Sequence, residues 1–487
     1  MTSTNAASHR SVPAMPPLSR RGFLLLSAAA TLAACVDEPP APSPGTSAAA
    51  SPTDRPSGTG ATSPTTTAPE PSATPAPATP RPSAAAGGRR TLYRDGALAD
   101  GRSERLRIGV SILVEGGRIA WIRPSDDEGD PGSRSSLEIV DASGATFVPG
   151  MVDGHSHVTL PGGAHWIERI DDPAAVLLEV AERNGRLLTA AGVRWARDVG
   201  APRVTDPTDG RTRALSLGVR DRWRGRAGLP NLRVAGTWLD RRGTLPPAAH
   251  TVAADDAAEL LENARGQLAD GVDFLKLYLD GPDPARSPWT AAQLAPVVEL
   301  AHAAGLRVTA HSGRLNGAIE GVRAGIDALE HGFELDADVA AEMARRGTFL
   351  VSTLAVMRSW QSFGATTTLP RFTTADGRRA IAARLERAEE SVRLAHRAGV
   401  RIATGTDFGG GSLRANQLAW EVESLVAAGL EPWEALAAAT WRGGELLGEA
   451  AAGTLTEGGP ADFFLVHGDP LSDPAALWRV WRVAWEA

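Results

Sequence analysis

Two histidines one residue apart, His155 and His157, close an apolar run that begins at Val148. Side chains alternate between the two faces of a β-strand, so both imidazoles point to the same side. Imidazole nitrogens are common ligands of zinc and related divalent ions. The pair therefore predicts a metal site at the end of a strand, although a lone His-x-His triplet among ten histidines could also arise by chance.

Further polar residues stand at the ends of later strand-like runs: Lys276, His311, His331 and Asp407. Each one alone has an ordinary structural explanation. A barrel lysine can be salt-bridged, a histidine can end a strand, and an aspartate can cap a helix. The joint occurrence of these residues with the histidine pair favours one shared metal-binding site.

The elements that must position these residues alternate between strand-like runs and alanine-rich helical segments. The strand-like runs cover residues 147–157, 193–199, 231–237, 274–279, 307–311, 328–331, 348–354 and 401–406. Eight strands that alternate with helices predict an α/β fold, a (β/α)₈ barrel. In such barrels the chemistry sits at the C-terminal ends of the strands, which is where the polar residues stand.

Short β-like runs precede Gly150, and a similar pattern returns after Ala452. We expect these two ends to pair as one small β-sandwich that flanks the barrel. The predicted domains are therefore 90–149 and 453–487 for the two parts of the sandwich, and 150–452 for the metal-binding barrel.

The N-terminal segment 1–35 has the pattern of an export signal. Arg20 and Arg21 precede an apolar run, 22–34, that is too short to span a bilayer as a permanent helix. The arginine pair resembles a twin-arginine (Tat) signal, and the residues 32–35 resemble a bacterial lipobox. Cys35 is the only cysteine of the chain. We expect a lipoprotein that is anchored to the outer face of the bacterial cell membrane through Cys35; an ordinary secretory signal with an incidental cysteine is the alternative.

The segment 36–89 consists mainly of Pro, Ala, Ser and Thr and should be a disordered linker. The lack of further cysteines excludes an intramolecular disulfide framework and cysteine metal ligands. A net charge of −7 gives no support for nucleic-acid binding. No run of the folded part is apolar enough to span a membrane, so the lipid is the only membrane anchor that we expect. Barrels of this kind often associate, which leaves a homo-oligomer open.

Several motifs resemble those of the amidohydrolase superfamily, in particular the branch of imidazolonepropionase and the metal-dependent Xaa-Pro dipeptidases. The motifs cover residues 149–157, 193–200, 272–278, 308–311, 324–332 and 403–407, and the closing segment 453–470 also matches. The resemblance extends over nearly all of 90–487.

The resemblance implies a centre of two divalent metal ions, with zinc as the default. By this resemblance His155, His157 and Asp407 hold one ion, and His311 and His331 hold the other. Lys276 bridges them as a carbamate formed with CO₂. An ammonium group has no lone pair and would repel two cations, whereas a carbamate presents two anionic oxygens. Manganese or cobalt would also fit the nitrogen and oxygen ligands.

The implied reaction is hydrolysis of a C–N bond in a small-molecule or dipeptide-like substrate, as an amide, peptide or cyclic amide. A metal-bridged hydroxide would attack the carbonyl, and Asp407 would pass its proton to the leaving nitrogen. Tyr278, on the strand face of Lys276, and Arg314, just beyond His311, are candidate substrate contacts.

Two alternatives remain. A mononuclear deaminase-like hydrolase is disfavoured, because such relatives carry a glutamate where this chain has Arg314, and because Lys276 occupies the bridging position. A catalytically silent surface protein that binds a ligand is disfavoured by the complete set of metal ligands.

Overall fold

The computed structural model describes residues 89–129, 137–163, 169–245, 248–363 and 369–486. The predicted signal 1–35, with Cys35, and the predicted linker up to residue 88 lie outside these residues. Among the described residues, no helix is long and apolar enough to cross a membrane.

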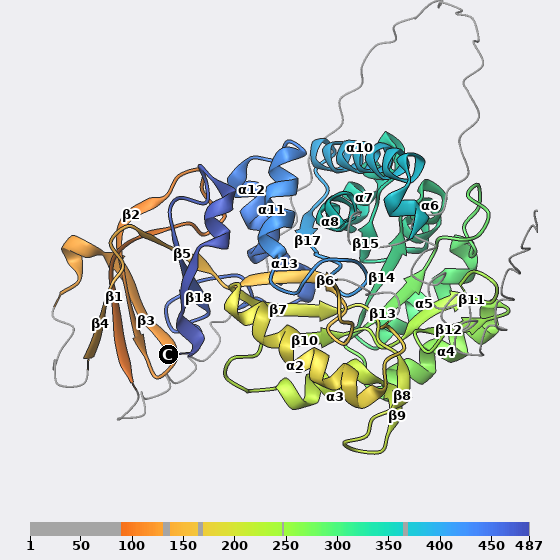
Figure 1. Ribbon diagram of the computed structural model, residues 1–487, viewed down its shortest axis with the longest axis horizontal. Helices are drawn as coiled ribbons and strands as arrows, with labels where there is room; N and C mark the ends of the chain where they lie inside the picture. Colours follow the sequence, from red (N-terminus) through yellow and green to blue (C-terminus); the bar gives the residue numbers. More distant parts are fainter. Residues whose placement is uncertain (1–88, 130–136, 164–168, 246–247, 364–368, 487) are drawn as a thin grey trace, which may run out of the picture. The chain divides into compact units, whose positions relative to one another are not determined.

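A ring of parallel strands forms the centre of the fold (Figure 1). The strands are β6 (Met151–Ser156), β7 (Val193–Asp198), β10 (Asn231–Val234), β13 (Phe274–Tyr278), β14 (Arg307–Ser312), β15 (Ala328–His331), β16 (Phe349–Ser352) and β17 (Ile402–Thr404). Each of the eight predicted runs coincides with one of them to within a few residues, which confirms the (β/α)₈ barrel. The ring closes where Asp407 N donates to His155 O, at 2.8 Å, and where Asp273 N donates to Val234 O, at 2.9 Å.

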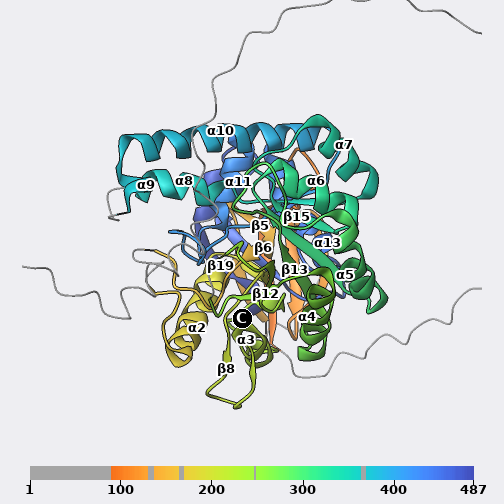
Figure 2. The ribbon, with the colours of Figure 1, turned by 90° about the vertical axis from the view of Figure 1, so that its right-hand side faces the viewer.

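Helices cover the outside of the ring (Figure 2). They are α2 (Ala174–Ala190), α3 (Leu215–Trp223), α4 (Ala257–Asp270), α5 (Ala291–Ala303), α6 (Leu315–Ala324), α7 (Ala337–Arg346), α8 (Leu354–Phe363), α9 (Pro370–Thr373), α10 (Ala375–Arg397), α11 (Leu418–Ala427), α12 (Pro432–Ala439) and α13 (Trp441–Leu447). Local sequence sets several of their ends. Asp336 caps α7 by accepting a hydrogen bond from Val339 N, and Gly347 ends that helix with φ at 73°.

The third barrel strand is shorter than its sequence run, because Gly236 adopts a φ of 85° and ends the extended backbone. The chain then forms β11 (Trp238–Arg241) and β12 (Thr251–Ala254), which pair with each other in parallel. A small hairpin, β8 (Arg203–Thr205) with β9 (Thr212–Ala214), lies between β7 and α3. Since β11 also pairs with β13, Trp238 is brought to the C-terminal mouth of the barrel.

The two ends of the described chain build the flanking β-sandwich. Its seven strands are β1 (Arg90–Leu98), β2 (Arg107–Glu115), β3 (Arg118–Pro124), β4 (Leu137–Asp141), β5 (Ala145–Pro149), β18 (Phe463–His467) and β19 (Val480–Val483). Ile119 of β3 also bonds residues 458 and 459, and Gly117 O accepts a hydrogen bond from Ala461 N, so the sheet folds around a core that contains Tyr93, Phe147 and Phe463. The strand β5 pairs with β18 from the other end of the chain, as expected.

Contacts between the β-sandwich and the barrel fix where β6 begins. Gly150 N donates to Asp462 O at 2.8 Å, and Arg194 forms an ion pair with the Asp462 carboxylate at 2.8 Å. A Cβ atom at Gly150 would lie 2.6 Å from Arg194 Cβ, so only glycine fits this crossing. The strand that ends in the two histidines is thus anchored at its start.

Glu421 of α11 is a buried carboxyl group that should make stability depend on pH. It accepts hydrogen bonds from Ser352 Oγ at 2.6 Å and Ala355 N at 2.7 Å, and burial raises its pKa to about 7. The folded protein therefore holds this proton more tightly than the unfolded chain. The resulting stabilisation is fully present below the ordinary pKa of about 4.5 and is lost as the pH rises through 7.

We expect Glu421→Gln to remove this dependence. Between pH 5 and pH 8 the free energy of unfolding of the variant should fall by roughly 2–3 kcal/mol less than that of the parent. Chemical denaturation of both proteins at the two pH values measures the difference. Parallel pH profiles would show that Glu421 titrates normally.

Candidate metal centre

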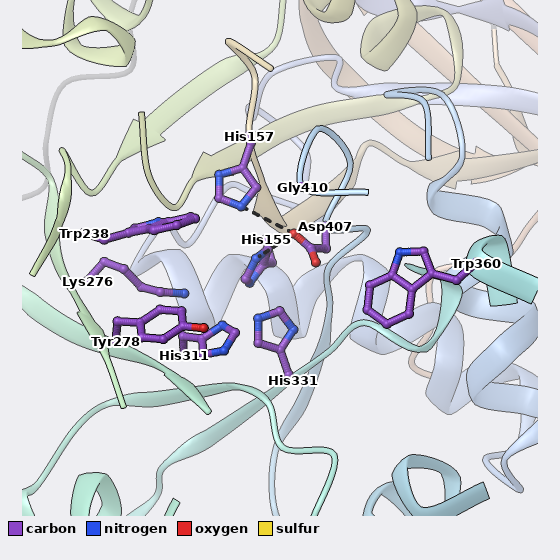
Figure 3. A pocket seen from close by; sticks show the side chains of 10 residues that line it. All are labelled: His155, His157, Trp238, Lys276, Tyr278, His311, His331, Trp360, Asp407 and Gly410. Carbon is purple, nitrogen blue, oxygen red and sulfur yellow. Dashed lines mark ion pairs between the residues drawn. The ribbon is translucent and has the colours of Figure 1, made fainter. Parts of the chain in front are cut away.

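A cavity opens at the C-terminal ends of the barrel strands (Figure 3). The described residues that line it are His155, His157, Trp238, Lys276, Tyr278, His311, His331, Trp360, Asp407 and Gly410. All six metal-site residues inferred from the sequence are among them. The structure therefore brings together side chains from five different strands and the turns that follow them.

His155, His157 and Asp407 form the tightest group of the site. Asp407 Oδ1 lies 3.2 Å from His155 Nε2 and 3.4 Å from His157 Nε2. All three residues are buried, and ligand atoms of the three lie within 4.8 Å of one another. Two imidazoles and one carboxylate at this spacing are a donor set that suits zinc.

His311 and His331 stand beside this group. Their ring centroids are 4.5 Å apart, and the ring of His331 is 4.6 Å from that of His155. In Figure 3 the rings of His155, His311 and His331 surround one space, with Lys276 extending toward it. The five histidine and aspartate side chains are thus close enough to serve a single centre.

Acceptor groups behind the cavity fix three of the imidazoles. His157 Nδ1 contacts Gly200 O at 2.9 Å, His331 Nδ1 contacts Thr353 Oγ1 at 2.8 Å, and His311 Nε2 contacts Asp280 Oδ2 at 3.2 Å. A partner on one ring nitrogen orients the other nitrogen, which is how ligating histidines are usually held. The sequence analysis assigned none of these partners. Asp280 could have been found, since it continues the period-two spacing of Lys276 and Tyr278.

Glu330 is a second residue that the sequence analysis missed. Its side chain is completely buried and forms ion pairs with Lys276 Nζ and, at 2.8 Å, with Arg197 Nη2. Thr309 Oγ1 donates to the same carboxylate at 2.9 Å. The Lys276 side chain thus meets the Glu330 carboxylate in the buried site. In an extended strand Glu330 would lie on the face opposite to its neighbour His331. The strand pattern therefore did not indicate a role for Glu330 in the site.

The backbone leaves the extended conformation at His331, so the alternation of faces does not hold there. His331 has a φ of 71° and Asp407 a φ of 56°, and Asp95 is the one other non-glycine residue of the described chain with positive φ. Left-handed backbone is unfavourable for residues with a Cβ and is held only where the surrounding structure enforces it. Here it allows Glu330 and His331 to reach the same site from adjacent positions.

The electrostatics suit a metal ion. Burial lowers the pKa of His155 to about 3 and that of His331 well below its usual value, so both are neutral at pH 7 and carry a lone pair. Burial alone would raise the pKa of Asp407, but His155 and His157 hold it well below its usual value. His155 Nδ1 has no hydrogen-bond partner among the described residues, although Glu330 Oε2 lies 3.3 Å away.

Gly410 leaves the space beside this donor set open. A Cβ at this position would lie 2.6 Å from Asp407 Oδ1 and 3.2 Å from His157 Cδ2. The space kept free by Gly410 fits a bound ion at His155, His157 and Asp407.

We expect Gly410→Ala to displace the Asp407 carboxylate and to lower both metal content and turnover, the latter by roughly 10²-fold. Gly266→Ala is a matched control, because Gly266 lies on the exposed face of α4 and a Cβ there would contact nothing. The control should be fully active and slightly more stable. Normal metal content and turnover in Gly410→Ala would contradict the proposed geometry.

The two candidate substrate residues differ in their placement. Tyr278 lines the cavity and stacks on His311, with ring centroids 4.2 Å apart and an interplanar angle of 13°. Arg314 Nη1 donates to Gly281 O at 3.3 Å, and Arg314 is not among the described residues that line the cavity. Contact of either residue with a substrate stays a prediction.

Comparison with known proteins identifies related chains. The model of the amidohydrolase family matches residues 146–483. An uncharacterised protein of Mycobacterium tuberculosis is 31% identical over 339 residues, which are 69% of this chain and 82% of that protein. Imidazolonepropionase of Salinispora arenicola is 28% identical over 392 residues, 74% of this chain and 86% of that one.

A solved structure shares the fold at lower identity. The crystal structure of a Xaa-Pro dipeptidase with methionine bound in its active site superposes with a TM-score of 0.69 and 23% identity. The superposition covers 80% of this chain and 97% of the dipeptidase.

Proposed function

The chain belongs to the amidohydrolase family, and from this premise we propose that it is a metal-dependent hydrolase that cleaves a carbon–nitrogen bond in an amide, peptide or cyclic amide. The family's members are hydrolases that mostly act on such bonds. One observation carries the proposal. The donor set converges on a single cavity: His155, His157, Lys276, His311, His331 and Asp407.

In the proposed centre, His155, His157 and Asp407 would hold one divalent ion, and His311 and His331 a second. Zinc suits these nitrogen and oxygen donors. Bound there, the ions would supply a nucleophile from water at neutral pH and polarise the substrate carbonyl. The remaining steps belong to the protein's own side chains.

Asp407 is the proton carrier of the proposed reaction. Its pKa is held well below the usual range, so the carboxylate is ionised at neutral pH and can accept a proton from the attacking water. The same carboxylate would then deliver that proton to the leaving nitrogen. His157 and His155 contact one of its oxygens and keep it directed into the cavity.

Lys276 would act as a carbamate. Its ammonium group releases two protons as the nitrogen bonds to the carbon of CO₂, so a cation beside Glu330 becomes an anion. Two anionic groups in a buried site repel each other strongly. The carbamate is therefore stable only when divalent cations lie next to it, and metal binding and carbamate formation should be coupled.

Metal content and turnover measured together test the proposal. The full-length chain incubated with zinc and bicarbonate should bind about two ions and release amine from N-acyl amino acids, dipeptides or cyclic amides. Removal of the metal should abolish turnover, and zinc should restore it. One bound ion with release of ammonia from a ring would instead identify a deaminase-like hydrolase. A chain without metal and without turnover would be a ligand-binding protein.

We also propose that the chain is exported as a lipoprotein through Cys35. The expected result for Cys35→Ala is protein released from the membrane fraction, with unchanged hydrolase activity. Retention of the variant in the membrane fraction would contradict the lipid anchor. Replacing Arg20 and Arg21 by lysine should leave active enzyme inside the cell if export follows the twin-arginine route.

A further inference from the structure

The cavity's selectivity depends on its lining residues outside the proposed metal centre. Of the described lining residues, only Trp238, Tyr278, Trp360 and Gly410 are not part of the proposed centre. Three of these are aromatic, and glycine has no side chain. No arginine and no second carboxylate belong to the described lining, so charge recognition of a substrate terminus has no obvious partner there.

Contacts within the protein hold one aromatic wall of the cavity in place. Trp238 Nε1 donates to Val199 O at 2.9 Å, and the Trp238 ring packs against Tyr278 with centroids 6.0 Å apart and an interplanar angle of 30°. Tyr278 is in turn stacked on His311. These contacts hold the two rings on the side of the cavity where Lys276 lies (Figure 3).

Trp360 forms the opposite wall and offers an unused donor. The side chain comes from α8, packs against Phe372 at 6.4 Å and is 4% exposed. Its Nε1 is buried and has no hydrogen-bond partner in the described part of the chain. A buried N–H without an acceptor is unfavourable, and an oxygen of a bound ligand would relieve this. In Figure 3 the indole nitrogen lies on the edge of the ring toward Asp407.

We propose that the substrate is an amide with a flat aromatic acyl group that packs between Trp238 and Trp360, and that an oxygen of this substrate accepts a hydrogen bond from Trp360 Nε1. The inference rests on the amide hydrolysis proposed above and names the substrate class of the same site. Aromatic rings gain more from such walls than saturated rings of similar size, because their faces and edges attract each other.

A series of N-acyl glycinamides tests the aromatic preference. The acetyl, cyclohexanecarbonyl and benzoyl compounds share one leaving group, and amine release reports turnover. With the metal-loaded enzyme, kcat/KM for the benzoyl compound should exceed that for the cyclohexanecarbonyl compound about tenfold. In Trp238→Leu this preference should disappear. Equal rates for the two rings in the parent enzyme would overturn the inference and leave the hydrolase function intact.

Two tryptophan variants test the hydrogen bond. Trp360→Phe keeps an aromatic wall and removes the N–H, so KM for the benzoyl compound should rise about five- to tenfold while kcat changes little. Trp289→Phe is the matched control, because Trp289 also buries an Nε1 without a partner but lies outside the cavity lining. The control should keep the parent KM.

Binding of ketone analogues, in which a methylene replaces the scissile N–H, separates failure of this inference from failure of the proposed function. By calorimetry, the benzoyl analogue should bind the parent about five- to tenfold more tightly than it binds Trp360→Phe. Equal affinity for both proteins would overturn the role of Trp360. Tight, Trp360-dependent binding with no turnover of any amide would contradict the hydrolase function and keep the aromatic site.

Discussion

Replacing Asp407 by asparagine should lower kcat by about 10³- to 10⁴-fold while the fold is retained. Asparagine has nearly the same shape as aspartate but lacks the negative charge and cannot take up a proton at neutral pH. The carboxylate lies 3.2 Å from His155 Nε2 and 3.4 Å from His157 Nε2, so the same change removes an anionic ligand from the tightest donor group. Metal content should therefore fall together with kcat.

Glu421→Gln is the control for this experiment, because it also converts a buried carboxyl group into an amide but lies outside the cavity lining. It should keep the parent kcat and metal content at neutral pH. Stopped assays with the best amide substrate and elemental analysis of both variants give the comparison. Retention of more than a tenth of the parent kcat in Asp407→Asn would remove Asp407 from the proton pathway.

Replacing Lys276 by alanine should reduce the metal content from about two ions to one and lower kcat on the order of 10³-fold. The reason is the loss of the only side chain that can become a bridging carbamate in this cavity. Acetate or formate added with zinc should restore part of the activity, because a small carboxylate can enter the space that the lysine leaves. The parent, labelled with ¹³CO₂, should show a carbamate carbon signal that the variant lacks.

Lys276→Arg separates the carbamate from simple charge balance. An arginine keeps a cation next to Glu330, which preserves the buried ion pair, but its guanidinium does not form a carbamate. We expect this variant to fold and to be as inactive as Lys276→Ala. Parent-like activity in Lys276→Arg would show that the site needs a cation at this position and would exclude the bridging role.

Local patterns in the sequence predicted the barrel and the end of it at which the polar residues meet. Period-two spacing places His155 and His157 on one face of β6, and the alternation of strands and helices predicts the barrel and the edge at which its polar residues meet. These inferences depend on near neighbours in the chain. For the same reason the sequence predicted all six residues that the structure brings into one cavity, even though they are spread over more than 250 positions.

Interactions between distant segments decided the rest. Glu330 pairs with Lys276 and Arg197, and the positive φ of His331 breaks the alternation on which the sequence analysis relied. Trp238 reaches the cavity because Gly236 ends β10 and starts an extra strand.

The sequence by itself thus determined the fold class, because strand periodicity is a property of consecutive residues, and its resemblance to the amidohydrolase family supplied the proposed metal ligands. Only the tertiary structure decided which groups orient those ligands and which rings face them, because Asp280, Thr353 and Trp360 meet the site through the paths of separate loops and helices. No local pattern encodes such contacts, since packing of the whole barrel sets them.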